Sequence, residues 1–197
     1  MKPVFYTIPR KPTGHSSRVT DALWPTAVGL TSPRMTLEPL RVEHADEAVT
    51  AWSDVSLYQF TGGAPATERQ LRARYSRQVV GHSPDGTQGW LNWMLRRHDN
   101  GEIIGTVQAT VTRTATGRMN AELAWVIATN HQRQHLAGEA AATVIAWLHQ
   151  VGIDDLTAHI HTDHLVSAGV AHHLGLRPTT VIVDGEVEWR SGTRRNH

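Results

Sequence analysis

Residues 122–148 read Glu-Leu-Ala-Trp-Val-Ile-Ala, then Thr-Asn-His-Gln-Arg-Gln-His-Leu, then Ala-Gly-Glu-Ala-Ala-Ala-Thr-Val-Ile-Ala-Trp-Leu. The first run is almost continuously apolar, which is typical of a central strand buried on both faces. The third run places apolar residues at i, i+3, i+4, i+7, i+8 and i+11 from Ala137, which is the spacing of one helix face. Together they predict a buried strand, a polar loop and a long helix.

The loop between this strand and this helix is a candidate ligand site. A helix start leaves backbone N–H groups without partners at the positive end of the helix dipole, so it can hold a phosphate or pyrophosphate. Arg133 in the loop can add a charge-assisted contact. Many α/β domains share this arrangement without binding phosphate, so the interpretation needs support from the rest of the chain.

Strand and helix patterns alternate on both sides of this stretch. Short apolar or alternating runs predict strands at residues 36–40, 89–95, 103–112, 156–161 and 181–189. The second and third should pair antiparallel, and Asp184-Gly185 indicates a hairpin in the last. Helical spacing predicts helices at 45–52, 67–80 and 166–175, the second with a capping box from Thr67 to Gln70. The fold class is therefore α/β (α+β), with more strands than helices.

The chain has 197 residues, enough for one domain with a sizeable core. Residues 1–33 hold five of the nine prolines and show neither helical nor alternating spacing. We therefore predict an irregular N-terminal extension at 1–33, a folded domain at 34–191 and a short tail at 192–197.

Composition excludes several classes of function. The absence of cysteine removes disulfides, thiolate metal sites and a cysteine nucleophile. A net charge of +1 gives no general attraction to nucleic acid or to anionic membranes. No signal-peptide pattern and no run of about 18 apolar residues is present, so we expect a soluble, cytoplasmic protein without a membrane partner.

Five segments occur in the order found in GNAT acetyltransferases. They are Met35–Leu40, Gly101-Glu-Ile-Ile-Gly105, Glu122–Ala128, the loop and helix through Gln132–Trp147, and Ile160–Ser167 with His173-Leu-Gly-Leu176. From about Ser32 to Trp189 the chain resembles this superfamily, and most closely its RimJ and RimL branch, which acetylates ribosomal-protein N-termini. The resemblance implies an acyl-CoA-dependent N-acyltransferase, most simply one that moves an acetyl group from acetyl-CoA to a primary amine.

The resemblance also implies a fold and a place for the donor. The GNAT sheet is mixed and mostly antiparallel, carries helices on both faces and splays beside its central strand. The pantetheine arm would lie along Trp125, Val126 and Ile127. The family loop, Gln/Arg-x-x-Gly-x-Gly/Ala, holds the pyrophosphate through backbone amides. The residues implied in donor binding are, in and directly after this loop, Gln132, Arg133, Gln134, His135, Leu136, Ala137 and Gly138, and, in the later segment Ile160–Ser167, His164.

Two of these residues depart from the family pattern. His135 stands where the family has glycine, and a glycine there would supply a positive φ angle or close backbone approach. His164 stands where related enzymes commonly carry asparagine, and its larger ring would change the cleft.

The reaction needs a base, because an ammonium must lose a proton before it can attack a thioester. Glu122 at the start of the central strand is the candidate. Ser167 matches a family position whose hydroxyl assists the departing thiolate. Ala171 replaces the tyrosine that many GNAT enzymes carry before the final Leu-Gly segment. The candidate acceptor contacts are Tyr58, Trp90 and Trp93.

Alternatives stay open at this point. The altered loop and the arginines from Arg69 to Arg77 would suit another donor, such as a longer acyl-CoA, a carrier-protein thioester or an aminoacyl-tRNA. Loss of the loop glycine would also suit a domain that binds a ligand without catalysis. The thirteen histidines raise the question of a metal site. No recognised zinc spacing occurs among them, so we predict no metal. The acceptor, a small-molecule amine or a protein N-terminus, and the choice between monomer and homodimer are not determined by the sequence.

Overall fold

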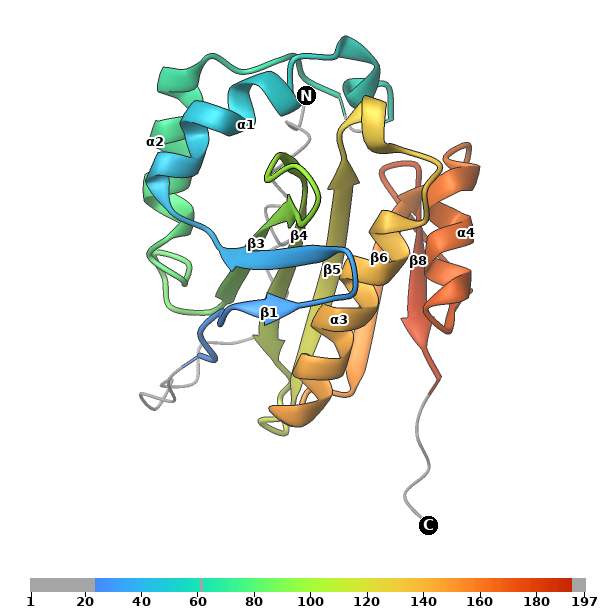
Figure 1. The fold of residues 1–197 in the computed structure, drawn as a ribbon. Coiled ribbons are helices and arrows are strands. Elements are labelled where there is room, and N and C mark those ends of the chain that lie inside the picture. The colour runs from blue at the N-terminus through green and yellow to red at the C-terminus, as the bar shows by residue number, and fades with distance from the viewer. Residues whose placement is uncertain (1–23, 61, 193–197) are drawn as a thin grey trace.

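The strands form one sheet through the middle of the molecule (Figure 1), and the computed structural model describes residues 24–60 and 62–192. The strand order is β1-β2-β3-β4-β5-β6-β8-β7. The strands are β1 (Leu30–Thr31), β2 (Met35–Pro39), β3 (Gly89–Arg97), β4 (Ile103–Arg113), β5 (Met119–Ile127), β6 (Asp155–His161), β7 (Leu176–Val183) and β8 (Glu186–Ser191).

In the described part of the chain, four α-helices cover the sheet on both faces. They are α1 (Ala45–Ala51), α2 (Glu68–Gln78), α3 (Leu136–Gln150) and α4 (Leu165–His173); short 3₁₀ turns lie at Val42–His44, Val55–Tyr58 and Thr129–His131. Residues of α1 and α2 pack with Met94 of β3 in one apolar cluster. Residues of α3 and α4 pack with Leu95 of β3 in a second cluster on the other face. The predicted fold class, a mixed and mostly antiparallel sheet between helices, is confirmed.

Local signals explain several of these elements. The side chain of Thr67 accepts a hydrogen bond from the amide of Gln70, and the two residues form the predicted capping box at the start of α2. Asp184 and Gly185 both have positive φ angles, 54° and 83°, in the tight turn between β7 and β8. That geometry matches the right-handed twist of a hairpin, so the Asp-Gly signal is confirmed.

The pairing of β5 with β6 is short. These two strands are parallel, whereas every other described neighbour pair is antiparallel, and their register covers only Asn120↔Asp155, Ala121↔Leu156 and Glu122↔Thr157. Beyond that point β5 still pairs with β4 as far as Ile127, while β6 pairs with β8. The sheet therefore splays between β5 and β6 from Leu123 onward, as the resemblance implied.

The splay corrects one prediction about β5. Its apolar run predicts burial on both faces, yet full burial from Leu123 to Ile127 is confined to one face. Leu123 and Ile127 lie in the core on that face with Trp125 half-buried between them, whereas Ala124 and Val126 on the other face are both half-buried. The strand has lost its β6 neighbour along this length, so its second face keeps contact with solvent.

The packed domain begins earlier than the predicted boundary at residue 33. Trp24 and Leu30 pack against the larger apolar cluster, and the Trp93 indole N–H donates to the carbonyl of Val28 at 2.7 Å. Glu139 on α3 accepts hydrogen bonds from the Ser32 hydroxyl at 2.7 Å and from the Arg34 guanidinium at 2.7 Å. Residues 24–33 are therefore part of the fold; residues 1–23 and 193–197 of the predicted extension and tail lie outside the described residues.

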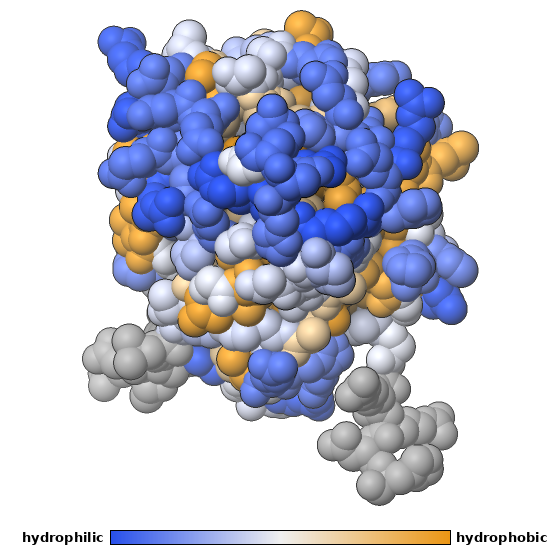
Figure 2. All heavy atoms as spheres, viewed as in Figure 1, coloured by the Kyte–Doolittle hydropathy of each residue, from blue (hydrophilic) through white to orange (hydrophobic). Residues whose placement is uncertain are grey.

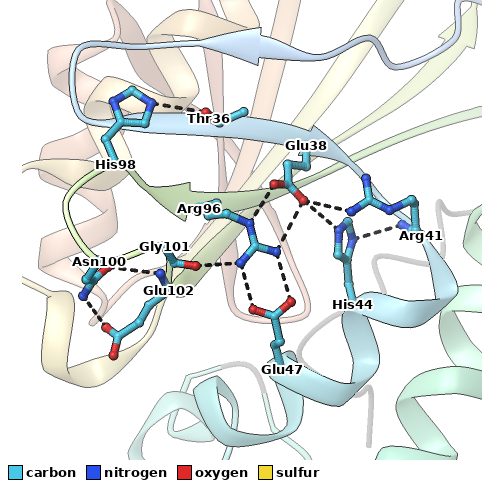
Figure 3. Close-up of polar contacts among 10 residues, drawn as sticks. All are labelled: Thr36, Glu38, Arg41, His44, Glu47, Arg96, His98, Asn100, Gly101 and Glu102. Carbon is cyan, nitrogen blue, oxygen red and sulfur yellow. Dashed lines mark hydrogen bonds and ion pairs between the residues drawn. The ribbon is translucent and has the colours of Figure 1, made fainter.

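A network of charged residues joins β2, β3 and α1 (Figure 3). The Arg96 guanidinium donates to Glu38 at 2.7 Å and reaches Glu47 through two nitrogens, at 2.8 and 3.0 Å. It also donates to the carbonyl of Gly101 at 2.6 Å. Glu38 in turn contacts the buried ring of His44. The network holds α1 against the sheet by pairing charges that the fold partly removes from water.

His44 is neutral in this network. Its Nδ1 accepts a hydrogen bond from the amide of Arg41 at 3.1 Å, so the ring proton lies on Nε2, which donates to Glu38 at 2.9 Å. Burial lowers the pKa of His44, although the hydrogen bond to Glu38 opposes that shift.

We expect Arg96→Met to lower the free energy of unfolding by about 2 kcal/mol, because two carboxylates would lose their shared partner inside a partly buried network. Urea unfolding followed by circular dichroism measures this change. Arg72→Met is the matched control, since Arg72 also bridges two carboxylates, Asp46 and Glu68, but at an exposed site. Equal losses in the two variants would show that the network adds nothing beyond a surface ion pair.

The lowered pKa of His44 predicts a pH dependence of stability. The unfolded chain binds a proton near the ordinary histidine value of 6.5 and the folded chain resists it, so stability should fall as pH drops below about 6.5. His44→Asn retains an acceptor for the Arg41 amide and should flatten this fall. Unfolding measured between pH 5 and 8 tests the prediction, and an unchanged slope in the variant would contradict it.

Candidate active site

β5 and β6 separate beyond Glu122 and Thr157, and the opening between the two strands is called the cleft below. From Leu123 to Ile127, no strand among the described residues pairs with β5 on its β6 side. Peptide groups along that side are therefore available to an extended ligand, which can pair with β5 as a missing strand would. The floor of the cleft is the last register pair, Glu122 with Thr157.

The loop that follows β5 leads to the start of α3 at the upper end of the cleft. Gln132 ties the loop to the strand, since its side-chain amide donates to the carbonyl of Ile127 at 3.0 Å. Gln134 accepts from the Arg97 guanidinium at 3.2 Å. The side chains of Gln132 and Gln134 therefore position the loop.

The backbone of this loop is left-handed at two residues that are not glycine. Arg133 has φ 59°, and His135, immediately before α3, has φ 61°. Such a conformation costs an L-residue about 1–2 kcal/mol. Position 135 thus requires the positive φ angle that the family glycine would supply, and the histidine adopts it.

The first turn of α3 presents its amides at this loop. Leu136, Ala137 and Gly138 begin the helix, so their N–H groups have no carbonyl acceptor four residues earlier within it. Leu136 and Gly138 are buried, and a Cβ built on Gly138 would meet the His173 ring of α4 at an ordinary 3.5 Å. The amides, the helix dipole and the adjacent Arg133 together suit an anionic diphosphate group.

Glu122 and His159 meet at the floor of the cleft. The Glu122 carboxylate lies 3.1 Å from His159 Nδ1, and the two side chains are 23% and 20% exposed. Trp90, Thr110 and Glu122 are consecutive register partners across β3, β4 and β5, so they share one face of the sheet. Trp90 is half-buried in this row, on the same face as the predicted base.

Ser167 and His164 meet at the start of α4. The Ser167 hydroxyl lies 3.2 Å from His164 Nε2, and the His164 ring stacks on Phe60 with 4.4 Å between centroids. Burial, and then the nearby His161, lower the pKa of His164, so the ring is neutral near pH 7. A neutral imidazole can accept or donate at the hydroxyl, so this pair can orient Ser167.

Two residues predicted as acceptor contacts lie in the interior instead. Trp93 is 0% exposed and packs edge-on against Trp147, on the face of β3 that α3 covers. Tyr58 is buried, with its hydroxyl donating to the carbonyl of Trp52 at 2.8 Å. Both rings fill core space, which is what large aromatic side chains do most often.

Phe60, His159 and His161 were not among the predicted site residues. His161 lies beside Phe60, with 5.7 Å between ring centroids. The even spacing of His159 and His161 with Thr157 along β6 places these two histidine side chains on one face of the strand. Among the described residues, no group of three or more histidine or carboxylate side chains lies close enough to hold a metal ion.

Away from the cleft, a shallow hollow of about 500 Å³ lies along the flank of α3, lined by Leu30, Thr31, Pro33, Glu139, Ala142, Thr143, Ala146, Trp147 and Gln150. Figure 2 shows hydrophilic side chains gathered over the upper half of this face, with more hydrophobic residues lower down where α3 lies. The hollow includes none of the predicted site residues. No helix in the described part of the chain is long and apolar enough to span a bilayer.

Comparison with known proteins assigns the fold and the family. The model of the acetyltransferase (GNAT) domain matches residues 34–177. A GNAT-family acetyltransferase from Bordetella pertussis aligns with a TM-score of 0.63 at 23% identity, over 84% of this chain and 99% of that one. No curated protein sequence matches.

Two solved structures with ligands share the fold. RimL, the ribosomal L7/L12 α-N-protein acetyltransferase solved with coenzyme A, aligns with a TM-score of 0.67 at 11% identity, over 83% of this chain and 95% of that one. MccE, the microcin C7 self-immunity acetyltransferase solved with acetyl-CoA and AMP, aligns with a TM-score of 0.65 at 13% identity, over 81% and 92%. With the splayed sheet and the matched domain, the chain belongs to the GNAT acetyltransferase family.

Proposed function

We propose that this protein transfers an acetyl group from acetyl-CoA to a primary amine, on a small molecule or at a protein N-terminus. The observation that carries the proposal is the continuity of the cleft. Its floor holds Glu122, its open edge runs along β5 from Leu123 to Ile127, and its upper end meets the loop and first turn of α3.

Coenzyme A fits the chemistry of this path. The amides at Leu136, Ala137 and Gly138 and the cation of Arg133 suit the pyrophosphate. The amide-bearing pantetheine arm can pair with the open edge of β5 beside Trp125, Val126 and Ile127. In that position the thioester would lie toward the floor, where the titratable side chains lie.

Transfer would be direct. An amine that has lost its proton at the floor of the cleft attacks the thioester carbonyl, the C–N bond forms and the C–S bond breaks. Glu122 is the candidate for the general base that removes this proton. The Ser167 hydroxyl, held by His164, is suited to hydrogen-bond the departing thiolate.

The class of acceptor is inferred from the side chains at the floor of the cleft and from the aromatic rings near it. RimL acts on a ribosomal protein, whereas the MccE complex contains acetyl-CoA and AMP. Here Trp90, Phe60, His161 and the carboxylate of Glu122 suit an ammonium group carried on a partly apolar body.

We expect Ala137→Glu to abolish binding of acetyl-CoA and coenzyme A in calorimetric titrations in which the unaltered protein binds both. A carboxylate in the first turn is favourable to the helix, so the fold should persist, but it would repel the pyrophosphate. Ala142→Glu on an exposed face of the same helix is the matched control and should bind normally. Equal binding by both variants would remove the donor site from the start of α3.

His135→Gly in the same titration tests whether donor binding needs only the positive φ angle at position 135 or also the histidine side chain. The variant should bind the donor at least as well as the unaltered protein, because glycine adopts the same φ angle without strain. Failure of the unaltered protein to bind, with or without rescue by glycine, would overturn acetyl-CoA as the donor.

Ser167→Ala should lower kcat by about tenfold or more while the Kd of coenzyme A stays within about twofold, because the hydroxyl acts on the leaving thiolate and not on donor binding. Release of the coenzyme A thiol reports the rate, and the protein itself has no cysteine to interfere. Ser76→Ala on exposed α2 serves as the control. Unchanged turnover in Ser167→Ala would remove this residue from the reaction.

A further inference from the structure

We infer that the side-chain amides of Asn92 and Gln108 select the acceptor by hydrogen bonding to a carboxamide group that the acceptor carries beside its reactive amine. The inference rests on the proposed amine acetylation and deepens it by naming two specificity-determining residues and the group that they bind. An amino-acid amide and the N-terminus of a peptide both carry this group, whereas a polyamine does not.

The two amides lie side by side on one face of the sheet. Asn92 in β3 and Gln108 in β4 are register partners, so their side chains stand on the same face. Met94, two residues from Asn92, packs with residues of α1 and α2, which identifies this face as the one that those helices cover. Glu122 stands on it too, because its partner in β4, Thr110, lies two residues from Gln108. The amides and the predicted base therefore share one face of the sheet.

The apolar packing beneath α1 and α2 stops short of the pair. The cluster under these helices includes Met94 and Val126. It includes no member of the next row of register partners, which consists of Asn92, Gln108 and Ala124. Gln108 and Ala124 are half-buried, so this row is partly open to solvent. A ligand on this face of the sheet can therefore reach the amides.

Both side-chain amides lack a hydrogen-bond partner in the described part of the chain. Asn92 is only 8% exposed, yet no group in residues 24–60 or 62–192 forms a hydrogen bond with its side chain, and the same holds for Gln108. Asparagine is uncommon in strands, and a shielded amide without a partner costs free energy. A ligand that supplies the missing partners would recover this cost on binding.

A third carboxamide lies toward the same end of this face. Gln78 is 8% exposed and follows the buried Tyr75 along one stripe of α2, so it faces the sheet. Its Oε1 is buried and accepts no hydrogen bond from any described residue. The end of α2 lies beside the start of β3, because the Trp90 amide donates to the carbonyl of Gly81 at 2.8 Å. A buried acceptor without a donor at this place suits a ligand that brings an N–H group.

A carboxamide is the ligand group that this pair matches best. Each side-chain amide has two N–H donors and one carbonyl acceptor. A ligand carboxamide offers both a carbonyl and an N–H, so it can accept from one side chain and donate to the other. A second ammonium group could only donate, and a carboxylate could only accept and would be repelled by Glu122.

The position of the pair relative to Glu122 suits a carboxamide that is attached next to the amine. Gln108 and Glu122 are diagonal neighbours, because they lie on adjacent strands and two positions out of register. Such neighbours are roughly 7–8 Å apart, within reach of long side chains. An amine beside Glu122 and a carboxamide one carbon away can then be held together, and two points of attachment orient the amine for attack.

The test uses Asn92→Leu and Gln108→Met, which remove the amides and keep side chains of similar size. Asn120→Leu is the matched control, since Asn120 lies in β5 on the same face but its carbonyl already accepts from the Thr112 hydroxyl at 2.6 Å. Three amines with the same aromatic body serve as probes. Phenylalaninamide carries the carboxamide, phenylalaninol carries a hydroxyl, and phenethylamine carries neither.

Release of the coenzyme A thiol gives kcat/KM for each probe, and each probe is compared between proteins because the three amines differ in basicity. With phenylalaninamide, both variants should lose about tenfold or more, since the site no longer pairs with the acceptor. With phenethylamine, their rates should stay within about twofold of the unaltered protein. Asn120→Leu should leave the ratio of the two rates unchanged, and the Kd of coenzyme A should be the same in all the proteins.

Two further measurements separate recognition from a structural role. Urea unfolding should show unchanged or raised stability in Asn92→Leu, because no hydrogen bond of the folded protein is lost and an unpaired amide leaves a shielded position. Calorimetric titration of phenylalaninamide into protein saturated with coenzyme A, which carries no acetyl group to transfer, should show binding that both variants weaken.

A peptide probe distinguishes the two sources of the carboxamide. An amidated tripeptide that begins with phenylalanine should show the same losses in both variants as phenylalaninamide. Faster turnover of the tripeptide than of phenylalaninamide would identify a peptide N-terminus as the acceptor, and slower turnover would identify a small amide.

Three results would overturn the inference. Equal losses with phenethylamine and phenylalaninamide would mean that the amides do not act on the acceptor carboxamide. An equally large loss with phenylalaninol would mean that a hydroxyl group suffices. Acetylation of polyamines in preference to phenylalaninamide would leave the proposed function standing without carboxamide recognition. If coenzyme A binds but the unaltered protein acetylates neither the probes nor polyamines, the proposed acetylation itself fails, and the inference fails with it.

Discussion

The early end of hydrogen bonding between β5 and β6 is the constraint on which the rest of this protein depends. Two adjacent parallel strands ordinarily pair along their whole length, because unpaired peptide groups inside a fold are costly. Here pairing stops at Glu122 and Thr157. The structure tolerates the open edge because each strand keeps its outer neighbour, β4 on one side and β8 on the other. A ligand with peptide-like groups can then satisfy what the sheet leaves open.

The two faces of β5 contact different parts of the molecule. Leu123 and Ile127 of β5 anchor the strand to the cluster beneath α3, while Glu122 and Val126 face the side covered by α1 and α2. Glu122 and the apolar cluster beneath α3 thus lie on opposite faces of one strand. The charged network around Arg96 holds α1 on the second face, so this helix is fastened by polar contacts as well as by apolar packing.

Much of the fold was predictable because its signals are local. The α3 stripe, the Thr67–Gln70 capping box and the Asp184-Gly185 turn each arise from residues close in sequence, and each is present in the structure. The burial of β5 was overestimated, because whether a strand has a neighbour on both sides depends on pairing with residues far along the chain. The packing of Trp24 and Leu30 was missed for the same reason. Their segment shows neither helical nor alternating spacing in the sequence, so nothing local marks it as part of the core.

The site was predictable only in part. Glu122, Ser167 and the loop were expected from an ordered resemblance and stay predictions; Glu122 is the last residue of β5 that pairs with β6. His159, His164 and Phe60 could not be predicted as neighbours of the site, because they reach it through contacts between separate elements that no sequence spacing indicates. Trp93 shows the opposite failure, because an aromatic ring in a strand has the same sequence signal whether it lines a pocket or fills the core.

The hydrogen bonds from Ser32 and Arg34 to Glu139 bear on where this domain can be cut. The matched family region begins at residue 34, yet the first turn of α3 is tied down by a residue before that boundary. A protein trimmed to the family region would keep Arg34 and its bonds to Glu139, but it would lose the Ser32 hydrogen bond to α3 and all of β8, the outer neighbour of β6. The region matched by the family model is therefore shorter than the protein that must be expressed for the cleft to keep its shape.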